Sequence, residues 1–527
     1  MHKKILLGTI NFLQGDANAW LPYAVGCLIS YCRGIPEVNE RYTFMDPIFA
    51  SKPIEEYRDQ LLEADILGLT NYIWNQSYND RLSKYYTELR PDGMVIYGGP
   101  QVPEKAALYE KYCEERPWVG AHIAGLGEIA FAEWLLDLPT SNKVLRELPT
   151  PYTDGVFDYV FNDPSYVGVC VPIETDRGCP YSCAFCDWGG QAKSKITKFG
   201  YDECATELEY IYSQPKVTEL IFANANFGVF KDDVRITKKC VDLQKKCDNK
   251  IMILYGGFAK NGSKNIPPII DMLNDDLDIL DHNMKVSFQT HTKEVLKIIN
   301  RDNIKNEKLI PLIQEQKAKG HTITAEMIVT LPGETADSWL QSLHYQMHEL
   351  GIDKAFAYIL NVVSNTEIAD PDFQEKYGIV AKRISYGVKD LDQVILRKCF
   401  SFDTDEIVRT FDYHWVFNNF VNTEMVTGVT SLRDQTYEFF DKLDQMPILK
   451  SLVERNRDTV RAIFSDEAHT KLNKDQSMWV HTLRHDDLQV MIDNKEQVTK
   501  EIELVFKLRS GILWTVDSPY RKIPDFR

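Results

Sequence analysis

Three closely spaced cysteines are the residues of this chain whose type and spacing point most directly to chemistry. Cys179, Cys183 and Cys186 have the spacing C-x3-C-x2-C and follow an apolar run from Val169 to Ile173. Thiolates this close together on a short loop can converge on one cluster or one ion. Three soft ligands without a fourth cysteine nearby suit a [4Fe-4S] cluster with one open iron. Zinc is disfavoured because no fourth Cys or His follows at finger-like spacing.

The loop has further features that set it apart from a stretch with three unrelated free thiols. Gly178 and Pro180 shape its backbone, and the aromatic Phe185 stands directly before the last cysteine. With that aromatic residue, the motif resembles the signature of the radical S-adenosylmethionine (radical-SAM) enzymes. The resemblance implies a [4Fe-4S] cluster whose open iron takes the amino and carboxylate groups of S-adenosyl-L-methionine.

The elements that must position this loop have the pattern of an α/β protein. Apolar strand-like runs alternate with helical patterns over residues 169–385. The strands expected there are Val169–Thr175, Glu219–Asn224, Ile251–Gly256, Met284–Thr290, Ile323–Leu331 and Ala355–Val362. Six repeats are too few for a closed eight-fold barrel, and they fit the open (β/α)6 partial TIM barrel that the resemblance implies.

Residues 1–148 show a second strand–helix alternation, which predicts a Rossmann-like parallel sheet. The expected strands are Lys4–Ile10, Arg41–Asp46, Ile66–Thr70, Met94–Gly98 and His122–Ala124, and the expected helices are Tyr23–Tyr31, Ile54–Leu62, Gln76–Leu89 and Glu128–Leu136. No G-x-G-x-x-G follows the first strand, so an ordinary dinucleotide site is not supported. Residues 149–168, which begin with a stretch rich in proline and turn residues, are the predicted linker.

The ends of the strands in this first segment carry the residues expected to bind a large ligand. Ligands of open α/β sheets bind outside the carboxyl ends of the strands, and glycine lets backbone amides approach them closely. The candidates are Tyr72, Trp74, Asn75, Gly98, Gly99, Pro100, Gly125, Gly127 and Glu128.

This arrangement is similar to the cobalamin-binding domain that precedes the barrel in one branch of the radical-SAM family. The chain has no D-x-H-x-x-G motif, so the resemblance implies a corrin whose lower face is bare or water-bound beside Tyr72 and Trp74. The alternative is a degenerate Rossmann domain without a ligand.

Polar residues near the carboxyl ends of the barrel strands are the candidates for S-adenosylmethionine contacts. The resemblance places methionine, ribose and carboxylate contacts on the second and fourth strands, where this chain has Asn224, Asn226, Ser287 and Gln289. Glu326 lies inside the fifth strand and, if it faces inward, is the candidate for the sulfonium or the amino group. Turn capping by the asparagines and a buried structural glutamine are the alternatives.

Tyr358 and Asn361 end the sixth strand, near the expected substrate space. A phenol and a carboxamide there could supply a proton or a hydrogen bond, so both residues are the catalytic candidates. Residues 386–527 are predicted to be mainly helical and rich in aromatic side chains, with a small hairpin in the last thirty residues.

Composition narrows the possible partners and the compartment. The net charge is −17, with 60 Lys and Arg against 77 Asp and Glu, which disfavours a nucleic-acid partner. No stretch approaches the roughly 20 apolar residues of a spanning helix, so no membrane partner is expected. The first residues are predicted to form a buried strand rather than a signal peptide. Eleven cysteines without a disulfide pattern fit a reducing cytoplasm.

Taken with the resemblance, these features predict a cobalamin-dependent radical-SAM methyltransferase that acts on an unactivated carbon of a small molecule or peptide. The resemblance implies that a 5′-deoxyadenosyl radical removes a substrate hydrogen and that methylcobalamin donates the methyl group. An electron donor such as flavodoxin or ferredoxin is the implied partner. Two alternatives stay open: a radical-SAM rearrangement, cyclisation or sulfur-insertion enzyme, and a cobalamin- or cluster-binding protein without turnover.

Overall fold

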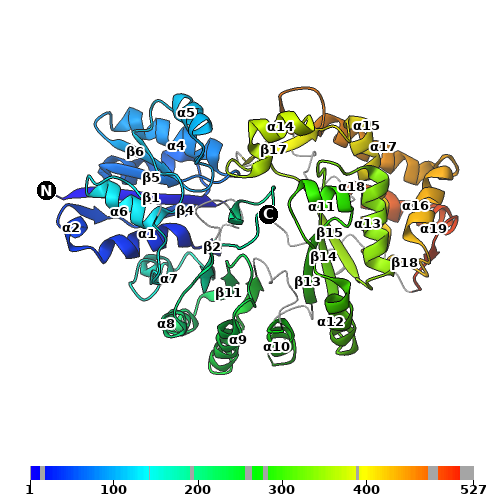
Figure 1. Ribbon diagram of the computed structural model, residues 1–527, viewed down its shortest axis with the longest axis horizontal. Coiled ribbons are helices and arrows are strands. Elements are labelled where there is room, and N and C mark those ends of the chain that lie inside the picture. The colour runs from blue at the N-terminus through cyan, green and yellow to red at the C-terminus, as the bar shows by residue number, and fades with distance from the viewer. Residues whose placement is uncertain are drawn as a thin grey trace.

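The computed structural model describes residues 2–11, 18–141, 143–189, 195–255, 264–276, 283–386, 391–472 and 485–510. An N-terminal sheet with its helices forms one end of the molecule, and an arc of strands and outer helices leads from it to a mainly helical C-terminal part (Figure 1). The overall order is therefore the one that the sequence predicts. Among the described residues, no helix combines the length and apolar character needed to cross a bilayer.

The first sheet is parallel, with the strand order β3-β1-β5-β6-β7 and with β4 paired to β1. All residues of β5 are buried, as expected for a central strand that is covered on both faces. The strands are β1 (Lys3–Asn11), β3 (Tyr42–Phe44), β4 (Ile48–Ala50), β5 (Ile66–Thr70), β6 (Met94–Gly98) and β7 (Ala121–His122). The predicted strands of this segment are confirmed, with bounds for β5 and β6 that match the prediction.

Helices cover both faces of this sheet because successive residues of each strand point to opposite sides. Ile5 and Leu7 of β1 pack in one core with α1 (Tyr23–Arg33) and α6 (Gly127–Leu135). Leu6, between them, packs in the other core. The helices on that second side are α3 (Arg58–Glu63), α4 (Gln76–Leu89) and α5 (Ala106–Glu114), the last of which the sequence analysis did not predict.

The second segment has the six predicted strands, all of them parallel to their neighbours. They form two sheets in the part of the chain that the structure describes, in the orders β12-β11-β8-β2 and β13-β14-β15. Their bounds are β8 (Gly168–Ile173), β11 (Val217–Phe222), β12 (Met252–Tyr255), β13 (Asn283–Gln289), β14 (Thr322–Val329) and β15 (Lys354–Ile359). Gly256, the predicted end of the third strand, lies outside the described residues.

Helices surround these strands on the outside of the arc (Figure 1). Those between strands are α8 (Tyr201–Ser213), α9 (Lys231–Gln244), α10 (Ile266–Asp271), α11 (Lys293–Ile298), α12 (Asn306–Ala318) and α13 (Ala336–His348), of which α10 was not predicted. A short strand from the first segment, β2 (Asn18–Trp20), pairs with β8 and extends the barrel sheet. The two segments therefore share a sheet, which local sequence patterns did not reveal.

The C-terminal part is mainly helical, as predicted, and it also contains a small sheet that the sequence analysis did not predict. β16 (Val380–Tyr386) pairs antiparallel with β17 (Leu391–Lys398) and parallel with β19 (His469–Leu472). β16 escaped prediction because it carries the charged Lys382 and Arg383. The helices are α14 (Pro371–Tyr377), α15 (Thr404–Val416), α16 (Leu432–Asp441), α17 (Pro447–Ile463), α18 (His485–Asp493) and α19 (Lys495–Glu503).

The hairpin expected in the last thirty residues falls mostly on residues 511–527, which lie outside the described residues. β20 (Lys507–Leu508) pairs antiparallel with the distant β18 (Val426–Thr427). This pairing ties the described end of the chain to the helical core around Trp415 and Phe439.

Candidate active site

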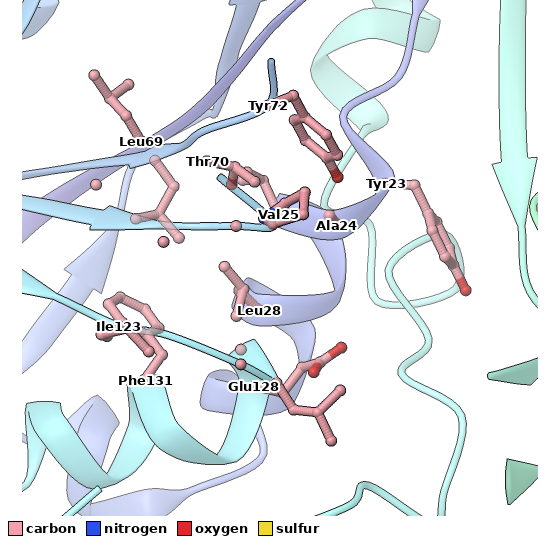
Figure 2. Close-up of a pocket in the computed structure, with 18 of the residues that line it drawn as sticks. Tyr23, Ala24, Val25, Leu28, Leu69, Thr70, Tyr72, Ile123, Glu128 and Phe131 are labelled. Carbon is pink, nitrogen blue, oxygen red and sulfur yellow. The ribbon is translucent and has the colours of Figure 1, made fainter. Parts of the chain in front are cut away.

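A cavity of about 210 Å³ lies at the carboxyl ends of β5, β6 and β7 in the first sheet. The side chains of Leu28 from α1, Ile123 after β7 and Phe131 from α6 form an apolar wall, and Tyr23, Tyr72 and Glu128 bring polar groups to its other side (Figure 2). An apolar hollow with a few polar groups at the strand ends is the usual setting for a bound cofactor.

Seven of the nine residues predicted to bind a large ligand line this cavity. They are Tyr72, Gly98, Gly99, Pro100, Gly125, Gly127 and Glu128. Gly99 has a φ of 91° and Gly125 a φ of 80°, a region that side chains rarely allow. A Cβ atom at Gly99 would also lie 2.7 Å from the carbonyl oxygen of Asn71. Glycine is thus required here by the turn, and the turn shapes the cavity rim.

Trp74 and Asn75, the other two predicted residues, lie beside the cavity and not among its lining residues. The indole of Trp74 stacks on Tyr72 with ring centroids 4.4 Å apart and an interplanar angle of 12°. Asn75 is fully buried, and its Nδ2 donates to the carbonyl oxygens of Ile10 at 3.2 Å and Thr70 at 3.1 Å. This corrects the prediction for Asn75, whose side chain holds the loop after β5 in place.

The cysteine segment supplies the remaining wall of the cavity, through Glu174, Arg177 and Trp188. Nη1 of Arg177 donates to Oε1 of Glu128 at 2.8 Å, and Nη2 donates to Oε2 of Glu174 at 2.8 Å. The sequence analysis missed Glu174 and Arg177, because Glu128, the second carboxylate bound by Arg177, lies 49 positions away in the chain. Burial and then the nearby Glu174 carboxylate raise the pKa of Tyr72 to about 12, so its phenol stays protonated at neutral pH.

The cysteine loop follows directly, after the short strand β9 (Asp176–Arg177). Cys179 and Cys183 are buried, Cys186 is half-buried, and none of the three forms a disulfide in the structure. Nδ2 of Asn226 donates to Sγ of Cys179 at 3.2 Å, and Nη1 of Arg301 donates to Sγ of Cys183 at 3.7 Å. Buried sulfur atoms that receive N–H groups are suited to be thiolate ligands of an iron–sulfur cluster.

The three sulfur atoms do not gather as ligands of a single ion. In the described part of the chain, no three His, Cys, Asp or Glu side chains are arranged to hold one metal ion. A cluster with several irons accepts one thiolate at each of three irons, so the donor set fits a cluster better than a zinc ion. Phe185, on the same loop, packs against the large core formed by β13, β14 and β15.

Asn224 and Asn226 have different surroundings at the end of β11. Nδ2 of Asn224 donates to Oδ2 of Asp176 at 2.6 Å and to Oγ1 of Thr175 at 2.9 Å. Asn224 is therefore occupied in fixing the strand before the cysteines, which corrects its assignment as a cofactor contact. Oδ1 of Asn226 is buried without a hydrogen-bond partner in the described part of the chain and remains available to a ligand.

The predicted polar residues of β13 and β14 come together on the inner face of the barrel. Oγ of Ser287 donates to Oε2 of Glu326 at 2.6 Å, and Lys285 pairs with Oε1 of the same carboxylate at 3.2 Å. Gln289 ends β13 with a φ of 70°, where the pairing with β14 shifts its register. This shift re-aims the side chain at the strand end, a common feature near active sites.

The two catalytic candidates lie at the end of β15 but face different surroundings. Tyr358 is 43% exposed, and burial of its ring together with Glu326 raises the pKa of its phenol to about 12. Asn361 forms an isolated backbone bridge with Ile395, and its Oδ1 is buried without a partner among the described residues. Tyr358 is thus placed to donate a hydrogen bond into the barrel.

Two polar residues near the barrel strands have structural surroundings. Glu334 accepts from Thr290 and Thr292 at 2.6 Å each and from Ser338 in the first turn of α13, so its carboxylate holds the start of this helix. His291 packs between Phe288 and Tyr345, and burial lowers its pKa to about 4.

Comparison with known proteins agrees with this geometry. Residues 173–345 match the family model described as the Radical SAM superfamily. The cobalamin-dependent radical SAM methyltransferase TokK of Streptomyces tokunonensis is 29% identical over 406 residues, which are 71% of this chain and 58% of that protein. The 2-(S-pantetheinyl)-carbapenam-3-carboxylate methyltransferase of Streptantibioticus cattleyicolor is 28% identical over 412 residues. The chain spans 58% of the length of each of these two curated relatives.

Two solved structures share the fold of a large part of the chain. OxsB, a cobalamin-dependent S-adenosylmethionine radical enzyme solved with aqua-cobalamin and S-adenosylmethionine, has a TM-score of 0.55 and 12% identity and covers 95% of this chain and 80% of its own. The methyltransferase TsrM from Kitasatospora setae, solved with cobalamin and a [4Fe-4S] cluster, has a TM-score of 0.51 and 14% identity over 70% of this chain and 77% of its own. At these identities the likeness establishes a common fold.

Proposed function

We propose that the chain, whose residues 173–345 match the Radical SAM superfamily model, is a cobalamin-dependent methyltransferase acting on an unactivated carbon of a small molecule or peptide. We assign residues 1–148 to cobalamin binding, 149–168 to the linker, 169–385 to the radical-SAM barrel and 386–527 to a C-terminal domain of helices and a small sheet. Similarity to the methyltransferases TokK and 2-(S-pantetheinyl)-carbapenam-3-carboxylate methyltransferase supports methyl transfer.

One observation carries this proposal: the cavity of the first sheet and the cysteine loop share a wall. Arg177 and Trp188 line the cavity, and Cys179, Cys183 and Cys186 lie between these two residues in the sequence. A corrin in the cavity would therefore lie beside a cluster on the loop. When bound, the cluster supplies reductive cleavage of S-adenosylmethionine to a 5′-deoxyadenosyl radical, and cobalamin supplies a transferable methyl group.

The residues of the first sheet are suited to hold a large planar cofactor. The glycines at the ends of β6 and β7 leave backbone room, and Leu28, Ile123 and Phe131 provide an apolar surface. Tyr72 and Trp74, as a stacked pair at the rim, would face the corrin where the histidine-bearing motif is missing. Their aromatic surface keeps water from that side of the cavity.

The residues of the barrel are suited to hold S-adenosylmethionine and the substrate. We assign Asn226, Ser287, Gln289 and Glu326 to the first of these ligands, because they extend from the cysteine loop along the inner barrel face. Tyr358 lies next to Glu326 and would orient the substrate by a hydrogen bond, since its raised pKa keeps the proton on the phenol. We also assign Asn361 to substrate binding, because its Oδ1 is buried without a partner among the described residues.

The remaining partners follow from this chemistry. Reduction of the cluster needs an electron donor of low potential, such as flavodoxin or ferredoxin. We also propose the reducing cytoplasm as the place of action, where cysteine ligands of a cluster stay reduced.

Product analysis tests the proposal. The anaerobically reconstituted protein, incubated with S-adenosylmethionine, a reductant and extracts of candidate small molecules, should form both S-adenosylhomocysteine and 5′-deoxyadenosine together with a product that has gained one methylene in mass. Formation of 5′-deoxyadenosine without S-adenosylhomocysteine would show rearrangement or oxidation and would overturn methyl transfer. A protein that binds both cofactors but forms neither product would be a binding protein.

A further inference from the structure

A buried guanidinium lies against the cysteine loop. Arg301 is 6% exposed, and its Nη1 donates to Sγ of Cys183 at 3.7 Å. Its Nη2 donates to the carbonyl oxygen of Ser287, and its Nε donates to the carbonyl oxygen of Phe288 at 3.2 Å and to Oδ1 of Asn303 at 3.2 Å. One side chain therefore links the cysteine loop to the end of β13.

The positive charge of Arg301 has no carboxylate as its partner. Among the described residues, no Asp or Glu forms an ion pair with Arg301. In the same part of the chain, 30 ion pairs occur between other residues. The pairs of Arg177 with Glu128 and with Glu174 are two of them. A buried charge is costly unless an opposite charge and hydrogen bonds compensate it. The group in contact with Arg301 that can carry negative charge is the thiolate of Cys183.

The segment that carries Arg301 holds the loop at three successive positions. The backbone N–H of Ala184 donates to the carbonyl oxygen of Ile299 at 2.9 Å. Nδ2 of Asn300 donates to the carbonyl oxygen and to Oγ of Ser182 at 3.0 and 2.7 Å. These contacts on both sides of Cys183 fix the distance between the guanidinium and the sulfur atom.

We propose that Arg301 is the counter-charge of the cluster held by Cys179, Cys183 and Cys186, and that it raises the reduction potential of this cluster. The proposal rests on the proposed function, which supplies the cluster. A positive charge and N–H···S hydrogen bonds stabilise the more negative, reduced state, and both factors are known to set iron–sulfur potentials. In a site with little water the effect of one charge is poorly screened. Arg301 would thereby make one-electron reduction easier before S-adenosylmethionine is cleaved.

A redox titration of the full-length holoprotein tests this role. The electron paramagnetic resonance signal of the reduced cluster is followed in the wild type, Arg301→Gln, Arg301→Lys and Lys297→Gln, with dithionite as the reductant and without S-adenosylmethionine. Lys297 is exposed on α11, so Lys297→Gln removes one positive charge nearby without touching the loop. Iron content and circular dichroism report cluster loading and folding.

The expected result is a selective loss of reducibility in Arg301→Gln. At a fixed potential its ratio of reduced to oxidised cluster should fall at least tenfold, which for a one-electron couple is a potential lower by about 59 mV. The reduction potential of Lys297→Gln should match that of the wild type. Arg301→Lys keeps the positive charge but loses the planar guanidinium group, so its potential should lie between those of the wild type and Arg301→Gln. An unchanged potential in Arg301→Gln at wild-type iron content overturns the inference.

The iron content of the Arg301 variants provides a second test of the inference. Where Arg301→Gln takes up no cluster, the inference expects Arg301→Lys to take up iron as the wild type does, because the charge is what matters. Equal loss of iron in both variants would show that Arg301 acts only through its hydrogen-bond geometry and would overturn the inference. A wild type without any cluster would instead refute the proposed function.

Discussion

Arg177 and Glu128 join the first sheet and its helices to the cysteine segment by a hydrogen-bonded ion pair of 2.8 Å. Glu128 lies in the first turn of α6, and Arg177 lies two residues before the first cysteine of the loop. Glu174 binds the same guanidinium from the other side. Three charged side chains that are nearly inaccessible to solvent thus fix the wall between the cavity and the cysteine loop.

Removal of Arg177 should destabilise the protein strongly. Arg177→Met leaves two buried carboxylates without a cation, which typically costs about 3–5 kcal/mol. Urea unfolding of the cofactor-free protein at pH 8 measures this loss. Arg41→Met, which breaks the exposed pair with Asp137, is the control and should cost less than about 1 kcal/mol. Equal effects of the two variants would contradict the structural importance of the buried triad.

Enlarging the residue at Gly98 should block the cavity without disturbing the fold. Gly98 lines the cavity, and a Cβ atom there would meet only the carbonyl oxygen of Ile123 at 3.7 Å. Gly98→Ala should therefore bind cobalamin nearly as the wild type does, whereas Gly98→Leu should lose most of the binding at an unchanged melting temperature. Titration of the corrin absorption bands measures the affinity. Full binding by the leucine variant would place the corrin elsewhere.

Asn365 should contribute to cobalamin binding from a distance. Its Oδ1 accepts from the N–H of Glu104 at 2.8 Å, and its Nδ2 donates to the carbonyl oxygens of Pro100 at 2.9 Å and Val102 at 3.0 Å. These bonds hold the Gly99–Pro100 turn at the cavity. Asn365→Asp loses both donated bonds, so the dissociation constant of cobalamin should rise about tenfold, or about 1.4 kcal/mol.

The neighbouring ion pair supplies the control for Asn365. Lys105 pairs with Asp370 at the surface between the same two segments. Lys105→Gln should leave the dissociation constant within about twofold, because such exposed pairs contribute little. A similar rise of the dissociation constant in Lys105→Gln and Asn365→Asp would contradict this role. It would mean that the turn is supported by overall contact between the two segments and not by the hydrogen bonds of Asn365.

Asp176 should make the cofactor-free protein less stable as the pH rises. Burial, partly offset by the hydrogen bond from Asn224, raises the pKa of Asp176 to about 7, whereas an unfolded aspartate titrates near about 3.9. Because the folded pKa is the higher one, the stability is fully present below about pH 4 and declines as the pH rises through about 7. Urea unfolding at several pH values should show a smaller decline in Asp176→Asn. Parallel curves would indicate that Asp176 is ionised in the fold.

Local sequence patterns predicted the regular elements well because strands and helices follow short-range periodicity. β5, β6 and α4 have the predicted bounds, and the cysteine loop and the glycine turns at the sheet edge lie where the sequence placed them.

Contacts between distant segments could not be predicted from local sequence patterns. The pairing of β2 with β8 and the bonds of Asn365 join residues separated by more than a hundred positions, and the ion pair of Arg177 with Glu128 spans 49 positions. Asn75 and Asn224 show the same limit, because a carboxamide at a strand end has the same local signal whether it binds a ligand or the backbone. The burial of these two side chains and their hydrogen-bond partners, which the structure shows, indicate that each one binds groups of the protein itself.

The iron and cobalt content per chain tests the central claim most directly. After anaerobic reconstitution with iron, sulfide and cobalamin, the wild type should contain one cobalt and about four irons. The triple variant Cys179→Ala, Cys183→Ala and Cys186→Ala should lose the iron and keep the cobalt, while Gly98→Leu should keep the iron and lose the cobalt. A wild-type protein that binds iron but no cobalt, or variants that lose both metals together, would contradict two separate cofactor sites that share a wall.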